Sequence, residues 1–201
     1  MSYTLKEVLA NPKNYSGSRN ARQIRYLVFH YTANDGDKAM NNAKYFKNNV
    51  VKASAHYFVD DEFVYRSVHD LKVAWSVGGN KYANSDKTGG AKMYGVINNT
   101  KSISIEMCDT IQNGVYQASE ATLQNAAELG KKLMKQYNIP IENVYRHFDV
   151  TGKHCPSYLI NERKWAAFKS RLEDEEMDVK KLSDDDIVYL ITRYNQIVKD
   201  R

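Results

Sequence analysis

The sequence predicts an α/β protein in which helices flank a mixed central β-sheet, with an amphipathic helix at the C-terminal end. Over residues 1–172, segments rich in β-branched and aromatic residues alternate with segments of helical periodicity. This alternation is typical of helices packed on a sheet. The acidic stretch 173–186 is followed by apolar residues at helical spacing in 187–201. We therefore expect a domain over 1–172, an acidic linker over 173–186 and a helix over 187–201.

The first elements are expected to be a short helix, a loop and a buried strand. Residues 4–10 predict a short helix, which either Ser2 or Thr4 can cap. Residues 11–22 are rich in Asn, Ser and Gly and predict a loop. The nearly continuous apolar character of residues 24–31 predicts a strand buried on both faces.

A second helix and a β-hairpin are expected next. Residues 37–48 predict a helix whose apolar face carries Met40, Ala43, Tyr45 and Phe46. Two β-rich runs, 55–60 and 63–68, flank an Asp-Asp-Glu turn and predict the hairpin. By strand alternation Tyr57 faces the opposite side from its neighbours, and we expect it in the core.

A long loop, a strand and a long helix follow. Residues 76–101 are rich in Gly, Asn and Lys and predict a loop, of a length that is often functional. Residues 102–108 alternate polar and apolar side chains, which predicts a strand. Cys108, at the end of this alternation, is expected to be buried. Ser119 can cap a helix that runs to about Asn138 and ends before a proline.

The body is expected to close with a short extended segment and a last helix. Residues 144–147 are β-rich, and Asn161 can cap a helix that carries Trp165, Phe168 and Leu172. The C-terminal helix 187–201 would then dock on the body, pair with a second copy in a homo-oligomer, or begin a further domain.

Charge and composition restrict the classes of partner that this chain is expected to bind. The net charge is +5, but residues 173–186 carry −6 and residues 187–201 carry +2, which leaves +9 on residues 1–172. A basic body favours a polyanionic partner such as nucleic acid or an anionic cell wall. No motif of a nucleic-acid-binding module is present, so nucleic acid is not expected. The 2 cysteines do not form a disulfide framework.

Neither a leader nor a membrane span is expected. The first 15 residues, MSYTLKEVLANPKNY, have no apolar signal core. No run of 18 apolar residues exists, so membrane insertion is not expected. These observations predict synthesis in the cytoplasm without a signal peptide.

Three residues predict a metal site. His30 ends the apolar run 26–30, while His147 and Cys155 lie within the segment RHFDVTGKHCP at 146–156. Two imidazoles and one thiolate suit Zn²⁺, which accepts nitrogen and sulfur ligands together. Three protein ligands leave one tetrahedral position open, which is typical of catalytic rather than structural zinc.

The chain resembles the zinc-dependent N-acetylmuramoyl-L-alanine amidases of the amidase-2 type, whose fold phage endolysins and peptidoglycan recognition proteins share. The resemblance covers roughly residues 22–172. The segments that carry it are FHYT at 29–32, SAHYFVDD at 54–61, VAW at 73–75, SISIE at 102–106 and HFDVTGKHCP at 147–156.

The resemblance implies a peptidoglycan hydrolase that cuts the amide bond between N-acetylmuramic acid and L-alanine of the stem peptide. Zn²⁺ is the implied cofactor and bacterial peptidoglycan the implied partner. A phage or prophage endolysin, released through a holin, is the expected source. The alternatives are a bacterial autolysin and a non-catalytic peptidoglycan-binding module on the same fold. In this setting the C-terminal helix could begin a cell-wall-binding domain.

Two catalytic residues are expected. Ser102, Ser104 and Glu106 share one face of their strand, and this polar face is expected to look into a wet cleft, where Glu106 could carry a proton. Relatives that lack this glutamate use a tyrosine at the position of Ala55, and that departure favours Glu106. The resemblance further implies that Lys153 stabilises the oxyanion of the tetrahedral intermediate.

Four further residues are candidates for substrate binding: His56, Trp75, Asn98 and Asn99. His56 would either contact substrate or support the metal site from behind a ligand, and Trp75 would either line a groove or pack in the core. His154 is expected to face solvent. Many relatives have a histidine where this chain has Ser76, which bears on substrate preference near the rim.

Overall fold

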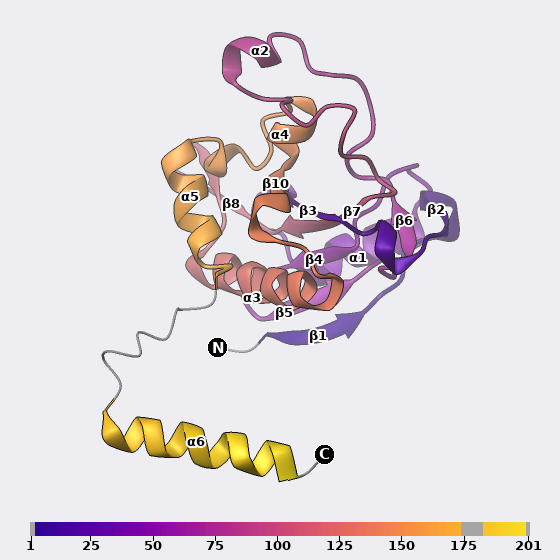
Figure 1. The fold of residues 1–201 in the computed structure, drawn as a ribbon. Helices are drawn as coiled ribbons and strands as arrows, with labels where there is room; N and C mark the ends of the chain where they lie inside the picture. Colours follow the sequence, from indigo (N-terminus) through magenta and orange to yellow (C-terminus); the bar gives the residue numbers. More distant parts are fainter. Residues whose placement is uncertain (1–2, 174–182, 200–201) are drawn as a thin grey trace.

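The computed structural model describes residues 3–173 and 183–199. Its centre is a six-stranded sheet in the order β1-β5-β4-β7-β3-β10 (Figure 1). In that order the strands are Thr4–Glu7, Phe63–Arg66, Tyr57–Val59, Ser102–Met107, Tyr26–Tyr31 and Val144–Arg146. Two two-stranded sheets pair β2 (Tyr15–Ser18) with β6 (Lys72–Ala74) and β8 (Thr110–Gln112) with β9 (Val115–Gln117).

The described residues form six helices, of which the last three follow the final strand, β10. They are α1 (Ala39–Asn48), α2 (Ser85–Thr88), α3 (Glu120–Tyr137), α4 (His147–Thr151), α5 (Glu162–Ser170) and α6 (Asp184–Lys199). Single 3-10 turns are η1 (Pro12–Asn14), η2 (Ala21–Gln23), η3 (Ile141–Asn143) and η4 (Ser157–Leu159). The predicted mixed α/β fold is thereby confirmed.

The predicted buried strand is β3, an inner strand that lies beside the edge strand β10. It pairs in parallel with β7 on one side and β10 on the other. Five of its six residues are buried, as the continuous apolar run predicts. Its register places His30 opposite Glu106. Since parallel neighbours end at the same edge of the sheet, the segments that follow β3, β7 and β10 meet there.

Alternating side chains divide the sheet into two faces. Leu27 and Phe29 join Ile103 and Ile105 in the main core, against Ala126 and Leu133 of α3 and Trp165 and Phe168 of α5. Figure 1 shows α3 and α5 next to each other beside the strands. Tyr57 belongs to this core, as predicted. The opposite face carries the side chains of His30 and Glu106, and α1 packs on that face through Phe58 and Tyr65.

Both predicted caps of the long helices are present. Ser119 accepts a hydrogen bond from the backbone N–H of Thr122 at the start of α3. Asn161 accepts from Arg163 and Lys164 at the start of α5. Each cap satisfies backbone donors that have no partner within the helix.

Three predictions for individual elements were wrong, wholly or in part. Residues 4–7 form strand β1 rather than a helix, because parallel pairing with β5 satisfies their backbone and the exposed Leu5 gives a helix no apolar face. The apolar face predicted for α1 was half right: Ala43 and Phe46 pack with Phe58 and Tyr65, whereas Met40 and Tyr45 are exposed and Ala39 is buried in their place.

The third error concerns β7. Ser102 and Ser104 are buried rather than wet, because the other segments of the body cover most of this face. Of the three polar side chains predicted there, Glu106 alone is partly exposed, at 20%. The pair β2–β6 and the hairpin β8–β9 were not predicted. For the hairpin, Asn113-Gly114 between two short β-rich runs was the available signal, and both residues have the positive φ that a tight hairpin turn needs.

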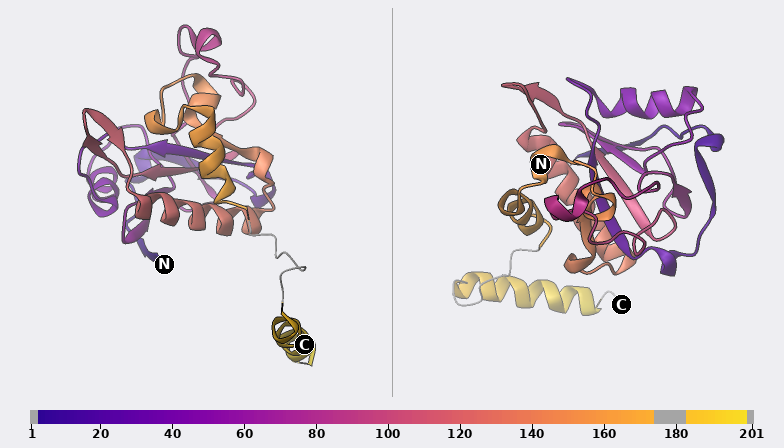
Figure 2. Two further views of the ribbon diagram at one scale, coloured as in Figure 1. Left: turned by 90° about the vertical axis from the view of Figure 1, so that its left-hand side faces the viewer. Right: turned by 90° about the horizontal axis from the view of Figure 1, so that it is seen from above.

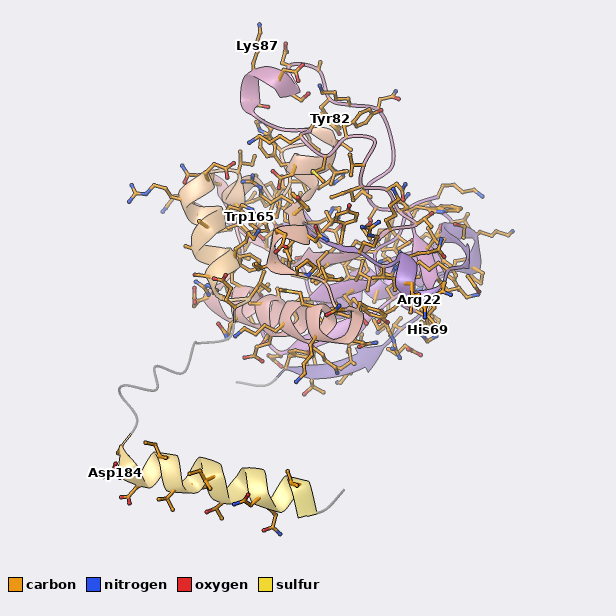
Figure 3. The ribbon with its side chains drawn as sticks, viewed as in Figure 1. Arg22, His69, Tyr82, Lys87, Trp165 and Asp184 are labelled. Carbon is orange, nitrogen blue, oxygen red and sulfur yellow. The ribbon has the colours of Figure 1, made fainter. Side chains whose placement is uncertain are left out.

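The long loop 76–101 projects from the body above α4 (Figures 1 and 2). It contains the single turn α2, and Lys87 at its tip points away from the protein (Figure 3). Ala91 and Met93 attach its base to α4 through backbone hydrogen bonds to Phe148 and Asp149. The loop is thus anchored to the segment that carries His147.

The predicted C-terminal helix exists and begins at Asp184, three residues before the expected boundary. Most of the acidic linker, residues 174–182, lies outside the described residues. Pairing of this helix with a second copy, docking and the start of a further domain all stay predictions. Among the described residues, no helix combines the length and apolar character needed to cross a membrane.

Candidate metal centre

The predicted trio converges at the edge where β3, β7 and β10 end. His30 is the penultimate residue of β3, and His147 follows β10 as the first residue of α4. Cys155 lies beyond α4, and its carbonyl accepts a hydrogen bond from the N–H of Phe148 at 2.9 Å. One ligand atom from each of the three residues lies within 4.8 Å of the others.

This arrangement fits a tetrahedral metal. Ligands about 2.0–2.3 Å from one zinc ion lie roughly 3.5 Å apart, so small side-chain shifts suffice. The imidazole rings of His30 and His147 are 4.6 Å apart at 58°, which lets two nitrogens face one point. His30 Nε2 and His147 Nδ1 are buried and have no hydrogen-bond partner among the described residues. Such orphaned atoms need a ligand, an ion or water.

The two histidines are held neutral, as metal ligation requires. Burial, the neighbouring His147 and the charge of Lys153 lower the pKa of His30 well below its ordinary value. Burial and Lys153 lower the pKa of His147 to about 3. Each imidazole therefore offers a lone pair at neutral pH without first losing a proton.

Cys155 is a thiol in the absence of metal. It is 2% exposed, and burial together with the carboxylate of Glu106 raises its pKa. The backbone N–H of Tyr31 and the charge of Lys153 oppose this effect by favouring the thiolate. A bound dication would convert this thiol to a thiolate outright.

Glu106 lies beside the trio. Its Oε1 is 3.7 Å from His30 Nδ1, and its Oε2 is buried with no hydrogen-bond partner in the described residues. Burial raises its pKa to about 8, with Lys153 acting in the opposite direction. A carboxyl group whose pKa lies near neutrality can both accept and return a proton.

Lys153 supplies the positive charge of the site. Its side chain is exposed, yet its charge lowers the pKa values of His30, His147 and Glu106. The left-handed Gly152 (φ 84°) ends α4 immediately before it. A side chain at Gly152 would meet Ser85 Cβ at 2.5 Å, so only glycine allows this close turn.

His56 lies in a buried network. The ring is 1% exposed, with Nε2 2.9 Å from Arg19 Nη2 and Nδ1 3.0 Å from Ser104 Oγ. Burial and the guanidinium of Arg19 lower its pKa to about 3. Both ring nitrogens have protein partners, which favours a supporting role over contact with substrate.

The other substrate candidates lie near the opposite end of β7. Asn98 and Asn99 precede that strand, and Asn99 Oδ1 accepts hydrogen bonds from the N–H groups of Ser76 and Val77. Asn98 Oδ1 accepts one from Lys101. These oxygens brace the loop.

Trp75 is neither core nor fully exposed. It is half-buried, and its indole N–H donates to Ser16 Oγ at 3.1 Å. Two predictions about burial are confirmed: His154 is exposed and Cys108 is buried.

The sequence reasoning missed Arg146. This arginine is 2% exposed and forms a bidentate pair with Asp149. The i, i+3 spacing of the two residues next to a candidate ligand was the available signal.

Comparisons with known proteins agree with this geometry. Residues 20–158 match the model of the family Amidase_2, N-acetylmuramoyl-L-alanine amidase. The chain is 32% identical over 172 residues to the N-acetylmuramoyl-L-alanine amidase CwlA of Bacillus subtilis strain 168, over 85% of this chain and 57% of that protein. The amidase XlyB of the same strain is 32% identical over 177 residues, 87% of this chain and 50% of XlyB.

Solved structures give the same result. The catalytic domain of XlyA, also from Bacillus subtilis, superposes with a TM-score of 0.64 at 28% identity. The match covers 85% of this chain and 99% of that domain. This chain spans about half the length of the curated relatives named above.

The fold and the site define an α/β protein with a buried cluster of two histidines and one cysteine at the carboxyl ends of parallel strands. The family match covers well over half of the sequence. The chain belongs to the amidase-2 family of N-acetylmuramoyl-L-alanine amidases, which confirms the resemblance drawn from the sequence.

Proposed function

We propose that this chain is a zinc-dependent amidase that cleaves the bond between N-acetylmuramic acid and L-alanine in bacterial peptidoglycan. The observation that carries the proposal is the buried convergence of His30, His147 and Cys155 in a member of this family. The names of CwlA and XlyB give the same activity for those relatives.

Zinc is the metal that the donor set fits. Two neutral imidazoles and one thiol supply nitrogen and sulfur together, whereas Mg²⁺ and Ca²⁺ prefer oxygen. When bound, zinc supplies a Lewis acid that polarises a carbonyl and makes water a nucleophile near neutral pH. Three protein ligands leave room for substrate and water.

Glu106 is proposed to carry the proton. It accepts a proton from the attacking water and returns it to the leaving amine of L-alanine, so the carboxyl group ends the cycle as it began. Its free Oε2 and its pKa near neutrality support this role. Lys153 is proposed to stabilise the oxyanion of the tetrahedral intermediate through its ammonium group.

Of the four residues predicted to bind substrate, only Trp75 is proposed to contact it directly. Trp75 is half-buried and leaves part of its ring free to line a sugar or peptide groove. His56, Asn98 and Asn99 are proposed to act behind the substrate surface, since their hydrogen bonds brace neighbouring segments. The basic body, +9 over residues 1–172, favours approach to an anionic wall.

A non-catalytic peptidoglycan-binding module is the second candidate. Such modules typically lose the cysteine ligand, whereas Cys155, Glu106 and Lys153 are all retained here. An endolysin released through a holin and a bacterial autolysin share the proposed chemistry and differ in the biology around it. The C-terminal helix is proposed to join the body to a wall-binding domain or to a second copy.

The proposal is tested by metal analysis and turnover together. Purified protein is expected to hold one zinc per chain and to release amino groups from Gram-positive cell walls. A chelator should abolish the release, and added Zn²⁺ should restore it. Wall binding without bound zinc or turnover would instead identify the non-catalytic module.

A further inference from the structure

The loop that carries two of the three ligands is closed at its base by a buried arginine. Arg146 is the last residue of β10 and immediately precedes His147. Its Nη1 donates to the carbonyls of Leu159 and Ile160, each at 2.9 Å. These contacts join the two ends of segment 147–158, which contains both His147 and Cys155.

All five N–H donors of the guanidinium are used. Nε and Nη2 form the bidentate pair with Asp149, at 2.9 and 2.6 Å. Nη2 also donates to Glu162 Oε1 at 2.9 Å. The ammonium group of a lysine has three donors and no planar fork, so it cannot reproduce this set.

Two aromatic rings fix the plane of the guanidinium. Its central carbon lies 5.2 Å from the ring of Phe148 and 5.2 Å from that of Trp165. Figure 3 shows Trp165 between α5 and the strands. Asp149 Oδ2 accepts in addition from the N–H of Arg146, which sets the start of α4 where His147 lies.

We infer that Arg146 is a positioning residue that holds the His147–Cys155 loop ready for metal before the metal binds. The inference rests on the proposed zinc site and goes beyond it by assigning the order of the empty loop to one side chain. We call the contacts of Arg146 with Asp149, Leu159 and Ile160 the Arg146 clamp. Without it, zinc binding would have to bring His147 and Cys155 together, and this would lower the affinity for zinc. Residues that orient metal ligands in this indirect way typically change metal affinity by roughly 10- to 100-fold.

The test compares Arg146→Lys with Arg171→Lys in the full chain. Arg171 also forms a two-pronged pair with a carboxylate, that of Glu120, but on the exposed surface between α5 and α3. Zinc affinity is measured by competition with a chromogenic chelator, at a temperature where circular dichroism shows each variant folded. Turnover is measured separately at saturating zinc.

The expected result is a zinc dissociation constant about 10- to 100-fold higher for Arg146→Lys. The value for Arg171→Lys should stay that of the parent. At saturating zinc, kcat of Arg146→Lys should return to within about threefold of the parent value, because the clamp touches no reacting atom. A purely structural role would lower the melting temperature and leave the zinc affinity of the folded chain unchanged, and that outcome would overturn the inference.

Two further outcomes are separable. If Arg146→Lys does not fold, zinc affinity is measured in Glu162→Gln, which weakens one of the five contacts of the guanidinium at the surface. Weaker zinc binding in this variant supports the inference, and parental binding overturns it. If the parent chain itself binds no zinc, the proposed function fails, whereas parental affinity in Arg146→Lys contradicts the clamp alone.

Discussion

Replacing Glu106 by glutamine should lower the activity and raise the stability of the zinc-free chain. The amide has the shape of the carboxyl group but cannot carry the proton. Oε2 has no protein partner, and Oε1 is 3.7 Å from His30 Nδ1, too far for a hydrogen bond. Little structure therefore depends on the charge. General acid–base catalysis contributes about 10²- to 10⁴-fold, so kcat should fall by that factor while zinc content is retained.

The stability of the zinc-free chain should rise in the same variant. Burial raises the pKa of Glu106 from 4.5 to about 8, so between these pH values the folded chain keeps a proton that the unfolded chain has lost. The free energy of unfolding of the parent therefore falls as pH rises through this window. At about 1.4 kcal/mol per pH unit, the loss at pH 7 is at most about 3 kcal/mol. Glutamine does not titrate and avoids it.

Urea unfolding of chelator-treated protein at pH 5 and pH 7 measures this effect. The advantage of Glu106→Gln over the parent should be small at pH 5 and grow to at most about 3 kcal/mol at pH 7. Glu142→Gln, at an exposed carboxyl group, is the matched control and should show no such growth. Parental activity in Glu106→Gln would remove it as proton carrier, and an unchanged pH dependence of unfolding would refute the burial argument.

Three other substitutions have distinct expected outcomes. Cys155→Ser should lose zinc and activity together, as metal analysis would show, and a variant that keeps stoichiometric zinc would exclude Cys155 as a ligand. Ser119→Ala removes the cap on the N–H of Thr122 and should cost about 1 kcal/mol in urea unfolding, with turnover unchanged. Gly152→Ala forces a left-handed alanine against Ser85 and should cost at least about 1 kcal/mol; no loss of stability would show that this turn relaxes freely.

The sequence predicted that His30, His147 and Cys155 come together, because each has a local signature. His30 ends a continuous apolar run, and such a run becomes an inner strand whose carboxyl end lies at the site. His147 and Cys155 are eight residues apart, so a single short segment brings them together. The helix caps at Ser119 and Asn161 were likewise visible in a few neighbouring residues.

Part of what escaped prediction depends on contacts between distant residues. Arg19 donates to the carbonyls of Asn99 and Ser102, about eighty positions along the chain, and no local pattern marks it as buried. The same arginine contacts the ring of His56, so the partners of His56 could not be predicted either. Strand β1 exists because β5 offers it a ladder, which local helix propensity cannot reveal.

Mass-spectrometric analysis of a Gram-positive cell-wall digest tests the central claim most directly. The proposed amidase should release glycan strands with free lactyl carboxyl groups and stem peptides with new L-alanine amino termini. Both products should disappear with a chelator and return with Zn²⁺. New reducing sugar ends, or cleavage within the stem peptide in place of new L-alanine termini, would contradict it.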